Sequence, residues 1–184
     1  MDLLDPVHDR LARFAHALTR NRETARDLVQ ETLLIAYEHF GELKDESAFA
    51  SWMFTIARRN FHKLNKRESF LEEYDENAAE KIEDTRIQPD VAMDIRLLYD
   101  ALARLPESQR EAVVMFEISG LTLEEIHSIQ GGSLSGVKSR LARGRKKLAS
   151  LLGVEDPSIV RVTQNPVAPA PALHETQVIS ITSF

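Results

Sequence analysis

The sequence of 184 residues contains no cysteine, so disulfides, a thiolate nucleophile and a cysteine-ligated metal are all excluded. No apolar run approaches the roughly 20 residues that a helix needs to span a bilayer. The N-terminal MDLLDPVHDR also lacks the basic-then-apolar order of a signal peptide. We therefore expect a cytoplasmic protein with no membrane insertion.

The motifs that usually accompany catalysis are missing as well. There is no G-x-x-x-x-G-K-[ST] phosphate loop, no G-x-G-x-x-G and no H-E-x-x-H, and the six histidines show no metal-ligand spacing. The run Gly131–Gly136 comes near a G-x-S-x-G nucleophile elbow, but it lacks glycine at position 135, and helical patterns rather than a strand flank it. These absences predict a protein that is not an enzyme and that uses no cofactor and no metal ion.

Negative charge is concentrated in one segment. The net charge is −6, yet residues 67–100 alone hold eleven acidic and four basic residues, and the stretches on either side are close to neutral. Between Glu68 and Asp90 apolar residues are few, which predicts a flexible acidic linker. A solvated spacer is the simpler interpretation. Alternatively, the carboxylates lie along a positively charged groove of a partner, in place of a nucleic acid.

Helical periodicity runs through the chain on both sides of this linker, and no strand-like alternation precedes residue 153. The fold class that we predict is all-α, with two small helical domains at 1–67 and 91–152 joined by the linker at 68–90. Residues 153–184 hold four of the seven prolines and little charge, which predicts a disordered C-terminal tail. The end of this tail is β-prone and could dock as a strand on a partner sheet.

The stretch from Thr122 to Leu152 carries the clearest functional pattern. Thr122 and Glu125 have the spacing of a capping box, which predicts a helix that begins there and ends at glycines 131 and 132. Ser133 can cap a second helix with an apolar stripe formed by Val137, Leu141, Leu148 and Leu151. Its other face carries six bases and no acid: Lys138, Arg140, Arg143, Arg145, Lys146 and Lys147. A helix-turn-helix places such a helix in the major groove of DNA; the simpler alternative is a solvated basic helix.

Two helices of the first domain carry further surface features. Residues 22–40 have a wide apolar face, with a core stripe of Leu28, Val29, Leu33, Ala36, Tyr37 and Phe40. Leu34 and Ile35 widen this face, which predicts either a contact surface or a helix buried on two sides. The next helix has aromatic residues, and no acid occurs between Ser51 and Arg67. That combination suits melted nucleic acid, although Trp52 at helical spacing also fits a core.

The order and spacing of three stretches resemble the bacterial sigma factors of the extracytoplasmic-function (ECF) group, which keep only conserved regions two and four. The first stretch, DLVQETLLIAYEHF at 27–40, is similar to the region-two helix that docks on the polymerase clamp. The second, FASWMFTIARRNFHKLNKR at 49–67, is similar to the part that melts and reads the −10 promoter element. The third, LPESQREAVVMFEISGLTLEEI followed by VKSRLARGRKKL, is similar to region four, which reads the −35 element.

The resemblance implies a role for each group of positions. The polymerase-binding residues would be Asp27, Gln30, Glu31 and Leu34. The −10 DNA would be contacted by Trp52, Arg58, Arg59, Asn60 and Lys63. The −35 DNA would be contacted by Ser133, Lys138, Ser139, Arg140, Ala142, Arg143 and Lys146. Arg140 and Lys146, together with Arg145, would lie on phosphates, which position a helix without specifying sequence.

The function implied by the resemblance is that of an alternative sigma factor, which binds core RNA polymerase and directs promoter-specific transcription initiation. The implied partners are the β′ clamp and β flap of the polymerase, promoter DNA and an anti-sigma factor. Four positions of the helix-turn-helix differ from residues common in the group: His127 replaces a small residue, Gln130 and Gly132 replace apolar residues, and Gly136 replaces Thr. The alternative is therefore a sigma-like interaction protein that binds polymerase or an anti-sigma factor without reading −35 DNA.

Overall fold

The computed structural model describes residues 3–72 and 89–154, and within these ranges it contains helices and no strand. The first half consists of α1 (Asp5–Thr19), α2 (Arg22–Glu38) and α3 (Phe49–Glu72), with two 3-10 turns, Phe40–Glu42 and Glu46–Ala48, between α2 and α3. The second half consists of α4 (Pro89–Ala103), α5 (Glu107–Val113), a π-helical turn (Val114–Ile118), α6 (Leu123–Gln130) and α7 (Leu134–Leu151).

The all-α fold is thereby confirmed. The linker was expected to be either a solvated spacer or a segment that lies along a partner's groove, and most of it, residues 73–88, lies outside the described residues. The tail was expected to be disordered or to dock as a strand, and residues 155–184 also lie outside the described residues.

Side-chain caps define where several helices begin. At α2, the Asn21 side-chain oxygen accepts from the backbone N–H groups of Glu23 and Thr24 at 2.8 and 3.0 Å. At α6, the backbone N–H of Glu125 donates to the Thr122 hydroxyl oxygen at 3.1 Å, and the N–H of Thr122 donates to the Glu125 carboxylate at 2.7 Å. Each cap satisfies backbone donors that a helix start leaves without intrahelical partners. The capping box predicted at Thr122 is therefore confirmed.

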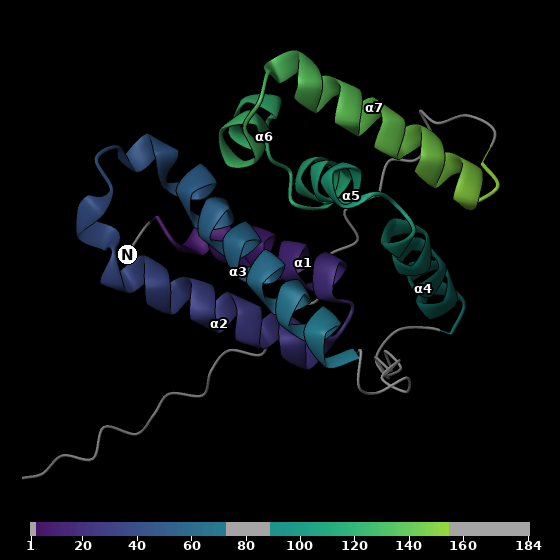
Figure 1. The fold of residues 1–184 in the computed structure, drawn as a ribbon, viewed down its shortest axis with the longest axis horizontal. Helices are drawn as coiled ribbons and strands as arrows, with labels where there is room; N and C mark the ends of the chain where they lie inside the picture. The colour runs from purple at the N-terminus through teal and green to yellow at the C-terminus, as the bar shows by residue number, and fades with distance from the viewer. Residues whose placement is uncertain (1–2, 73–88, 155–184) are drawn as a thin grey trace, which may run out of the picture.

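The first three helices pack around one another in Figure 1. Phe14 of α1 meets Phe54 of α3 edge to face, with ring centroids 5.2 Å apart. This geometry is the one that aromatic quadrupoles favour. The fully buried side chains around this pair belong to all three helices and include Leu11, Leu28, Met53 and Phe61.

In the second half, α7 crosses α5 at very short range. A Cβ atom placed on Gly144 of α7 would lie 2.7 Å from Cγ2 of Val113 and 3.2 Å from the carbonyl oxygen of Gln109. Real Cβ contacts are longer than this, so the absence of a side chain at Gly144 sets the distance between the two helices. The basic helix α7 is therefore packed tightly against the side of α5 that carries Gln109 and Val113.

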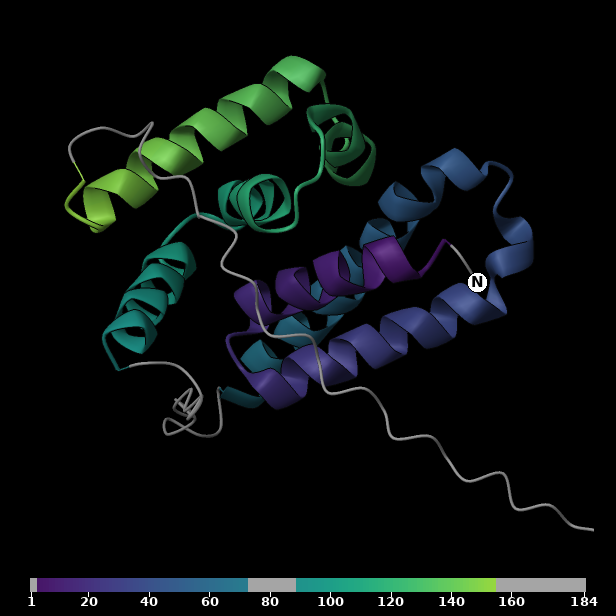
Figure 2. The ribbon, with the colours of Figure 1, turned by 180° about the vertical axis from the view of Figure 1, so that it is seen from behind.

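The two halves pack directly against each other. Both views place α5 between α7 and the three-helix group (Figures 1 and 2). The guanidinium of Arg10 on α1 donates to the carbonyl oxygens of Ser119 and Gly120 at 2.9 and 3.1 Å, and that of Arg13 donates to Ile118 at 3.1 Å. These carbonyls lie at the end of the π-helical turn that follows α5, where cations are stabilised by otherwise unpaired acceptors. The buried apolar residues of the two halves form one continuous cluster.

Further contacts join α1 to α4. Nδ1 of His16 lies 3.1 Å from the hydroxyl of Tyr99, and Arg20 forms an ion pair with Asp100. The sequence predicts two domains at 1–67 and 91–152, but gives no sign that they contact each other.

Candidate functional site

The outward face of α2 combines acidic and apolar side chains. Asp27 and Gln30 are exposed, Glu31 is half-buried, and Leu34 is 58 % exposed. Because Leu34 faces solvent, α2 is not a helix buried on two sides. The contact surface stays a prediction. This set of four side chains is called the α2 face below.

Two residues expected in the core of α2 extend the α2 face instead. Tyr37 is 80 % exposed and Phe40 is 50 % exposed, so their assignment to the core stripe is wrong. Tyr37 lies three residues after Leu34 and seven after Gln30, which places it on their side of the helix. Phe40 lies in the following 3-10 turn, where its ring meets Phe49 edge to face at 6.3 Å.

The five residues predicted to contact −10 DNA lie on α3 in different environments. Arg59 and Lys63 are exposed, and Trp52 is half-buried with its ring centroid 6.1 Å from that of Phe49. Arg58 is half-buried, and its Nε donates to Oε2 of Glu111 on α5 at 2.8 Å. Asn60 is buried, at 7 % exposure, and its side-chain nitrogen has no hydrogen-bond partner among the described residues. The second half of the molecule therefore covers part of the face on which these residues were expected to meet DNA.

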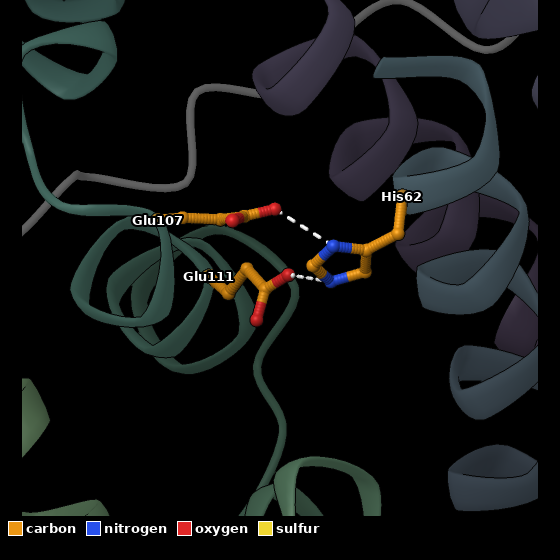
Figure 3. Close-up of side chains that lie close together, drawn as sticks. All are labelled: His62, Glu107 and Glu111. Carbon is orange, nitrogen blue, oxygen red and sulfur yellow. Dashed lines mark ion pairs between the residues drawn. The ribbon is translucent and has the colours of Figure 1, made fainter. Parts of the chain in front are cut away.

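A cluster of three titratable side chains lies at the contact between α3 and α5 (Figure 3). Nδ1 of His62 is 2.7 Å from Oε1 of Glu107, and Nε2 is 2.6 Å from Oε1 of Glu111. The Glu111 side chain is fully buried, whereas those of Glu107 and His62 are 49 % and 35 % exposed. When the imidazole is protonated, it carries a hydrogen on each nitrogen and can pair with both carboxylates.

The same three side chains have the residue types and proximity of a metal site, since one ligand atom from each lies within 4.8 Å of the others. However, the two ring nitrogens of His62 face two different carboxylates, and one cation can take only one of them. The guanidinium of Arg58 also occupies the second oxygen of Glu111. This geometry favours an ion-pair cluster over a metal centre.

The buried carboxylate of Glu111 continues the network into the helix-turn-helix. The side-chain amide of Gln130 donates to Oε2 of Glu111 at 3.2 Å and to the carbonyl of Ser108 at 3.1 Å. Nε of Arg140 on α7 then donates to the Gln130 side-chain oxygen at 2.9 Å. A chain of contacts thus leads from Arg58 on α3 through Glu111 and Gln130 to α7.

The motifs of the sequence do not predict this network, but the sequence contains one sign of it. Glu111 stands four residues before Met115 and seven before Ile118, in phase with an apolar stripe. A charged residue in such a position is rarely buried unless it is paired. Its partners come from α3 and α6, and the sequence alone gave no reason to bring these helices together.

Arg110, next to this cluster, is partly buried. Its guanidinium carbon is 5.6 Å from the ring centroid of Phe61, and burial lowers the pKa of Arg110 from its ordinary value. The carboxylates of Glu107 and Glu111 act in the opposite direction and favour the charged form.

The basic helix α7 presents most of its predicted DNA-contacting residues to solvent. Ser133 is exposed at the N-cap, where its hydroxyl oxygen accepts from the backbone N–H of Gly136 at 3.1 Å, as predicted. The other exposed members are Lys138, Ser139, Ala142, Arg143 and Lys146.

Two arginines of α7 are held by contacts within the protein. Arg140 is half-buried and donates from Nη2 to the carbonyl of Gly131 at 3.1 Å, in addition to its bond with Gln130. Arg145 forms an ion pair with Glu117, and its guanidinium carbon lies 5.0 Å from the Phe116 ring centroid. These two arginines hold α7 against the rest of the second half.

The four unusual positions of the helix-turn-helix have structural roles. His127 has its Nε2 3.0 Å from the carbonyl oxygen of Gly132, across the turn. Gly132 has a φ of 87°, which side chains other than glycine rarely adopt. Gln130 holds Arg140, and a Cβ on Gly136 would lie 3.3 Å from the capping hydroxyl of Ser133. His127 and Gln130 therefore stabilise the turn through hydrogen bonds, and Gly132 and Gly136 allow its backbone conformation and close packing.

None of the helices in residues 3–72 and 89–154 is both long and apolar enough to cross a membrane.

Comparison with known proteins identifies the family. The model of sigma-70 region 2 matches residues 3–70, and the model of sigma-70 region 4 matches residues 95–148. The ECF RNA polymerase sigma factor EcfG of Rhodopseudomonas palustris (strain TIE-1) is 35 % identical over 146 residues, which are 79 % of this chain and 80 % of the relative. The RNA polymerase sigma factor CarQ of Myxococcus xanthus is 30 % identical over 166 residues, covering 87 % and 92 % of the two chains.

A solved structure agrees with these sequence matches. The sigma factor RpoE of Bartonella quintana, in complex with the anti-sigma factor NepR, matches with a TM-score of 0.71 at 31 % identity, over 83 % of this chain and 96 % of that one. The fold and the two matched regions define a sigma-70-type transcription factor. Within that class, the chain belongs to the ECF RNA polymerase sigma factors.

Proposed function

We propose that this chain is an alternative sigma factor, which acts in the cytoplasm by binding core RNA polymerase and directing it to particular promoters. The observation that carries the proposal is the pairing, within one ECF sigma-factor chain, of the exposed α2 face with the acid-free basic face of α7. The protein itself performs no catalysis, because the polymerase supplies the chemistry of RNA synthesis. The functional units are residues 1–67 and 91–152, joined by the acidic linker.

The α2 face docks on the β′ clamp of the polymerase. Leu34 is a large apolar side chain with 58 % of its surface exposed, and Asp27 and Gln30 stand beside it as polar partners. An apolar centre with a polar rim is the usual composition of a protein interface. Tyr37 and Phe40 enlarge the apolar area of this surface. The second half contacts the β flap when the promoter is engaged.

The α3 helix binds the melted −10 element. Trp52 supplies a flat ring for stacking, and Arg59 and Lys63 supply exposed cations for phosphates. Stacking of a base on an aromatic side chain contributes about 1–3 kcal/mol, which can offset the cost of unstacking it from the duplex. Arg58, which pairs with Glu111 in this conformation, and Asn60 complete the predicted set.

The α7 helix reads the −35 element from the major groove. Lys138, Ser139, Ala142 and Arg143 are exposed along α7, next to the capped helix start at Ser133. Lys146 lies one turn further along and contacts phosphate. The braced turn between α6 and α7 supports DNA reading over the alternative of a sigma-like protein that has lost it, because His127 and Gln130 stabilise the helix-turn-helix.

An anti-sigma factor is the third partner that we propose. The support is the match to the Bartonella quintana sigma factor, which was solved in complex with the anti-sigma factor NepR.

Run-off transcription tests the proposal. Purified core RNA polymerase is mixed with the chain and with promoter fragments selected from genomic DNA, and specific initiation is expected from a subset of the fragments. An absence of initiation from every fragment, with core polymerase that is active with another sigma factor, would refute it. If the chain binds core polymerase but not −35 DNA, the sigma-like interaction protein is the correct description.

A further inference from the structure

Arg140 lies on a different row of α7 from the exposed residues assigned to −35 DNA. Side chains four residues apart lie one above the other on a helix, so Arg140 is aligned with Gly136 and Gly144. Ser139 and Arg143 form the neighbouring row, and both are exposed. Gly144, in contrast, is buried in the crossing with α5, and Arg140 is half-buried. The row of Arg140 therefore borders the rest of the second half, whereas the row of Ser139 faces solvent.

The guanidinium of Arg140 is bonded at the end of α6. Its Nε donates to the Gln130 side-chain oxygen at 2.9 Å, and its Nη2 donates to the carbonyl oxygen of Gly131 at 3.1 Å. Gly131 is the C-cap residue of α6. The carbonyls at the end of a helix lack intrahelical partners and favour a nearby cation. A side chain of α7 thus caps α6, which ties together the two helices of the helix-turn-helix.

Two further contacts fix the orientation of the Gln130 amide. Its nitrogen donates to the carbonyl oxygen of Ser108 at 3.1 Å and to Oε2 of Glu111 at 3.2 Å. Both hydrogens of the amide are therefore used, and its oxygen faces the Arg140 guanidinium, which has donors only. A glutamate at position 130 would place a second carboxylate beside the buried Glu111, and a leucine would offer no acceptor. Glutamine is the residue type that suits both neighbours.

The glycines at the other unusual positions lie beside the same guanidinium. Nη1 of Arg140 would be 3.9 Å from a Cβ on Gly132 and 3.8 Å from a Cβ on Gly136, so any side chain there would start in contact with it. His127 holds the turn at the next carbonyl, since its Nε2 is 3.0 Å from the carbonyl oxygen of Gly132. The four positions that differ from residues common in the group thus border Arg140 or hold the turn beside it. We call the residues around the guanidinium the Arg140 seat: Gln130, Gly131, Gly132 and Gly136.

We propose that Arg140 is a positioning residue, which sets the angle of α7 on α6 through the Arg140 seat and does not contact a DNA phosphate. This role replaces the phosphate contact that the resemblance implies, and it makes Gln130 a determinant of −35 affinity from a place outside the DNA interface. The proposal rests on the reading of −35 DNA by α7 proposed above. Base contacts need side chains that are held to within about 0.5 Å, so a tilt of α7 weakens all of them together.

The salt dependence of DNA binding separates a positioning residue from a phosphate contact. Arg140→Met and Lys146→Met each remove one positive charge and keep an apolar stem, and Lys146 is the exposed residue assigned above to phosphate. Loss of a phosphate contact lowers the slope of log K against log salt concentration by about 0.9, which is expected for Lys146→Met. For Arg140→Met we expect a roughly tenfold loss of affinity with an unchanged slope. An equal fall of the slope in the two variants would overturn the proposal.

The DNA for this measurement is the duplex that the full-length wild-type chain enriches from a pool of randomised duplexes. Fluorescence anisotropy measures binding, at a temperature at which circular dichroism shows each variant to be folded.

A double-mutant cycle tests whether Arg140 acts through the Arg140 seat. Gln130→Leu removes the acceptor that faces Arg140 but removes no charge. It is expected to weaken DNA binding roughly tenfold in the wild-type background and by less than about twofold in the Arg140→Met background, because the contact is already lost there. Equal losses in the two backgrounds would contradict the proposal, since Arg140 would then act independently of Gln130.

The outcomes separate this proposal from the proposed function. Sequence-specific binding by the wild type, with additive losses in the cycle, keeps the function proposed for α7 and overturns the positioning role. If the wild type enriches no sequence, the reading of −35 DNA by α7 is contradicted, and the same cycle is measured on the free energy of unfolding in urea. Coupling between Arg140→Met and Gln130→Leu in that cycle supports the Arg140 seat, and additive losses contradict it.

Discussion

Arg58 of α3 donates from Nε to Oε2 of Glu111 on α5 at 2.8 Å, and the Glu111 side chain is fully buried. Together with the two ion pairs of His62, this ion pair joins the helix expected to read the −10 element to the half expected to read the −35 element. A pair with one buried charge is costly to break by removing one partner, because the other is left without compensation. A substitution at Arg58 or Glu111 is therefore expected to weaken the packing of the two halves against each other.

A reversible cross-link between the halves should separate docking from initiation. Arg20 and Asp100 form an ion pair between α1 and α4, so Arg20→Cys with Asp100→Cys places two thiols within reach of a short, disulfide-containing bismaleimide. The linked protein is expected to bind core polymerase through the α2 face but not to initiate transcription. Reduction of the linker should restore initiation.

The controls for this experiment are the two single-cysteine variants treated with the same reagent. Full initiation by the linked protein would show that the halves need not separate. Initiation is measured as run-off product, and binding is measured by co-migration with core polymerase in size-exclusion chromatography.

Leu34→Ser should weaken binding to core polymerase by tenfold or more, because a large apolar side chain at the centre of an interface often contributes over 1 kcal/mol. The free energy of unfolding should change by less than about 0.5 kcal/mol, since Leu34 is exposed in the free chain. Fluorescence titration of labelled protein with core polymerase measures the affinity.

Leu97→Ser is the matched control, because Leu97 is also an exposed leucine, at 52 % exposure, but lies on α4. Equal loss of polymerase affinity in the two variants would mean that the α2 face has no special role.

Arg143→Ala should weaken binding to −35 DNA and reduce its salt dependence. Each phosphate contact that is lost lowers the slope of log K against log salt concentration by about 0.9. If Arg143 instead reads a base edge, the slope stays and discrimination against mismatched sites falls by about 1–3 kcal/mol. The control is Arg22→Ala, which removes the same charge at an exposed position of α2 instead of α7.

Fluorescence anisotropy at several salt concentrations separates these results. An Arg143→Ala variant that matches Arg22→Ala in both affinity and slope would exclude Arg143 from the DNA interface.

Gly144→Ala should destabilise the second half, although alanine is the better helix former. The new methyl group would lie 2.7 Å from Cγ2 of Val113 and 3.2 Å from the Gln109 carbonyl oxygen. Forcing α5 and α7 apart is expected to cost about 1–3 kcal/mol, more than the gain of about 1 kcal/mol in helix propensity. Urea unfolding followed by circular dichroism gives the difference.

Gly41→Ala is the control, because nothing lies within 4 Å of a Cβ placed at Gly41. An unchanged or raised stability of Gly144→Ala would show that α5 and α7 can move apart at little cost.

Thr122→Ala should destabilise the protein by about 1 kcal/mol through loss of the α6 cap. The Thr122 hydroxyl accepts from the N–H of Glu125 at 3.1 Å, so Thr122→Ser, which keeps this oxygen, should retain most of the stability. Thermal unfolding of the three proteins measures the effect. Equal losses for alanine and serine would assign the effect to the methyl group of threonine and not to the cap.

Local signals in the sequence were sufficient for the helix boundaries that depend on one side chain. Asn21, Thr122 and Ser133 act as caps because each side chain bonds to backbone donors two or three residues away, a relation that is contained in the spacing. Periodicity likewise identified the helices, since apolar residues of one face recur at helical intervals.

Long-range pairings were beyond the reach of such patterns. Glu111 was not identified because its partners Arg58 and Gln130 are far away in sequence and come together only when the halves pack. The apolar type of Tyr37 predicts a core position, whereas its place on α2 turns it outward beside Leu34. Asn60 is buried although its side chain is polar, and its polar type does not predict this.

Mapping the 5′ ends of transcripts tests most directly whether this chain confers promoter specificity. Core RNA polymerase is incubated with genomic DNA fragments, with and without the purified protein, and the 5′ ends of the RNA products are sequenced. Promoter recognition by α3 and α7 predicts a set of new start sites that share two sequence elements, near −10 and −35. Identical start sites with and without the protein, under conditions in which it binds core polymerase, would contradict it.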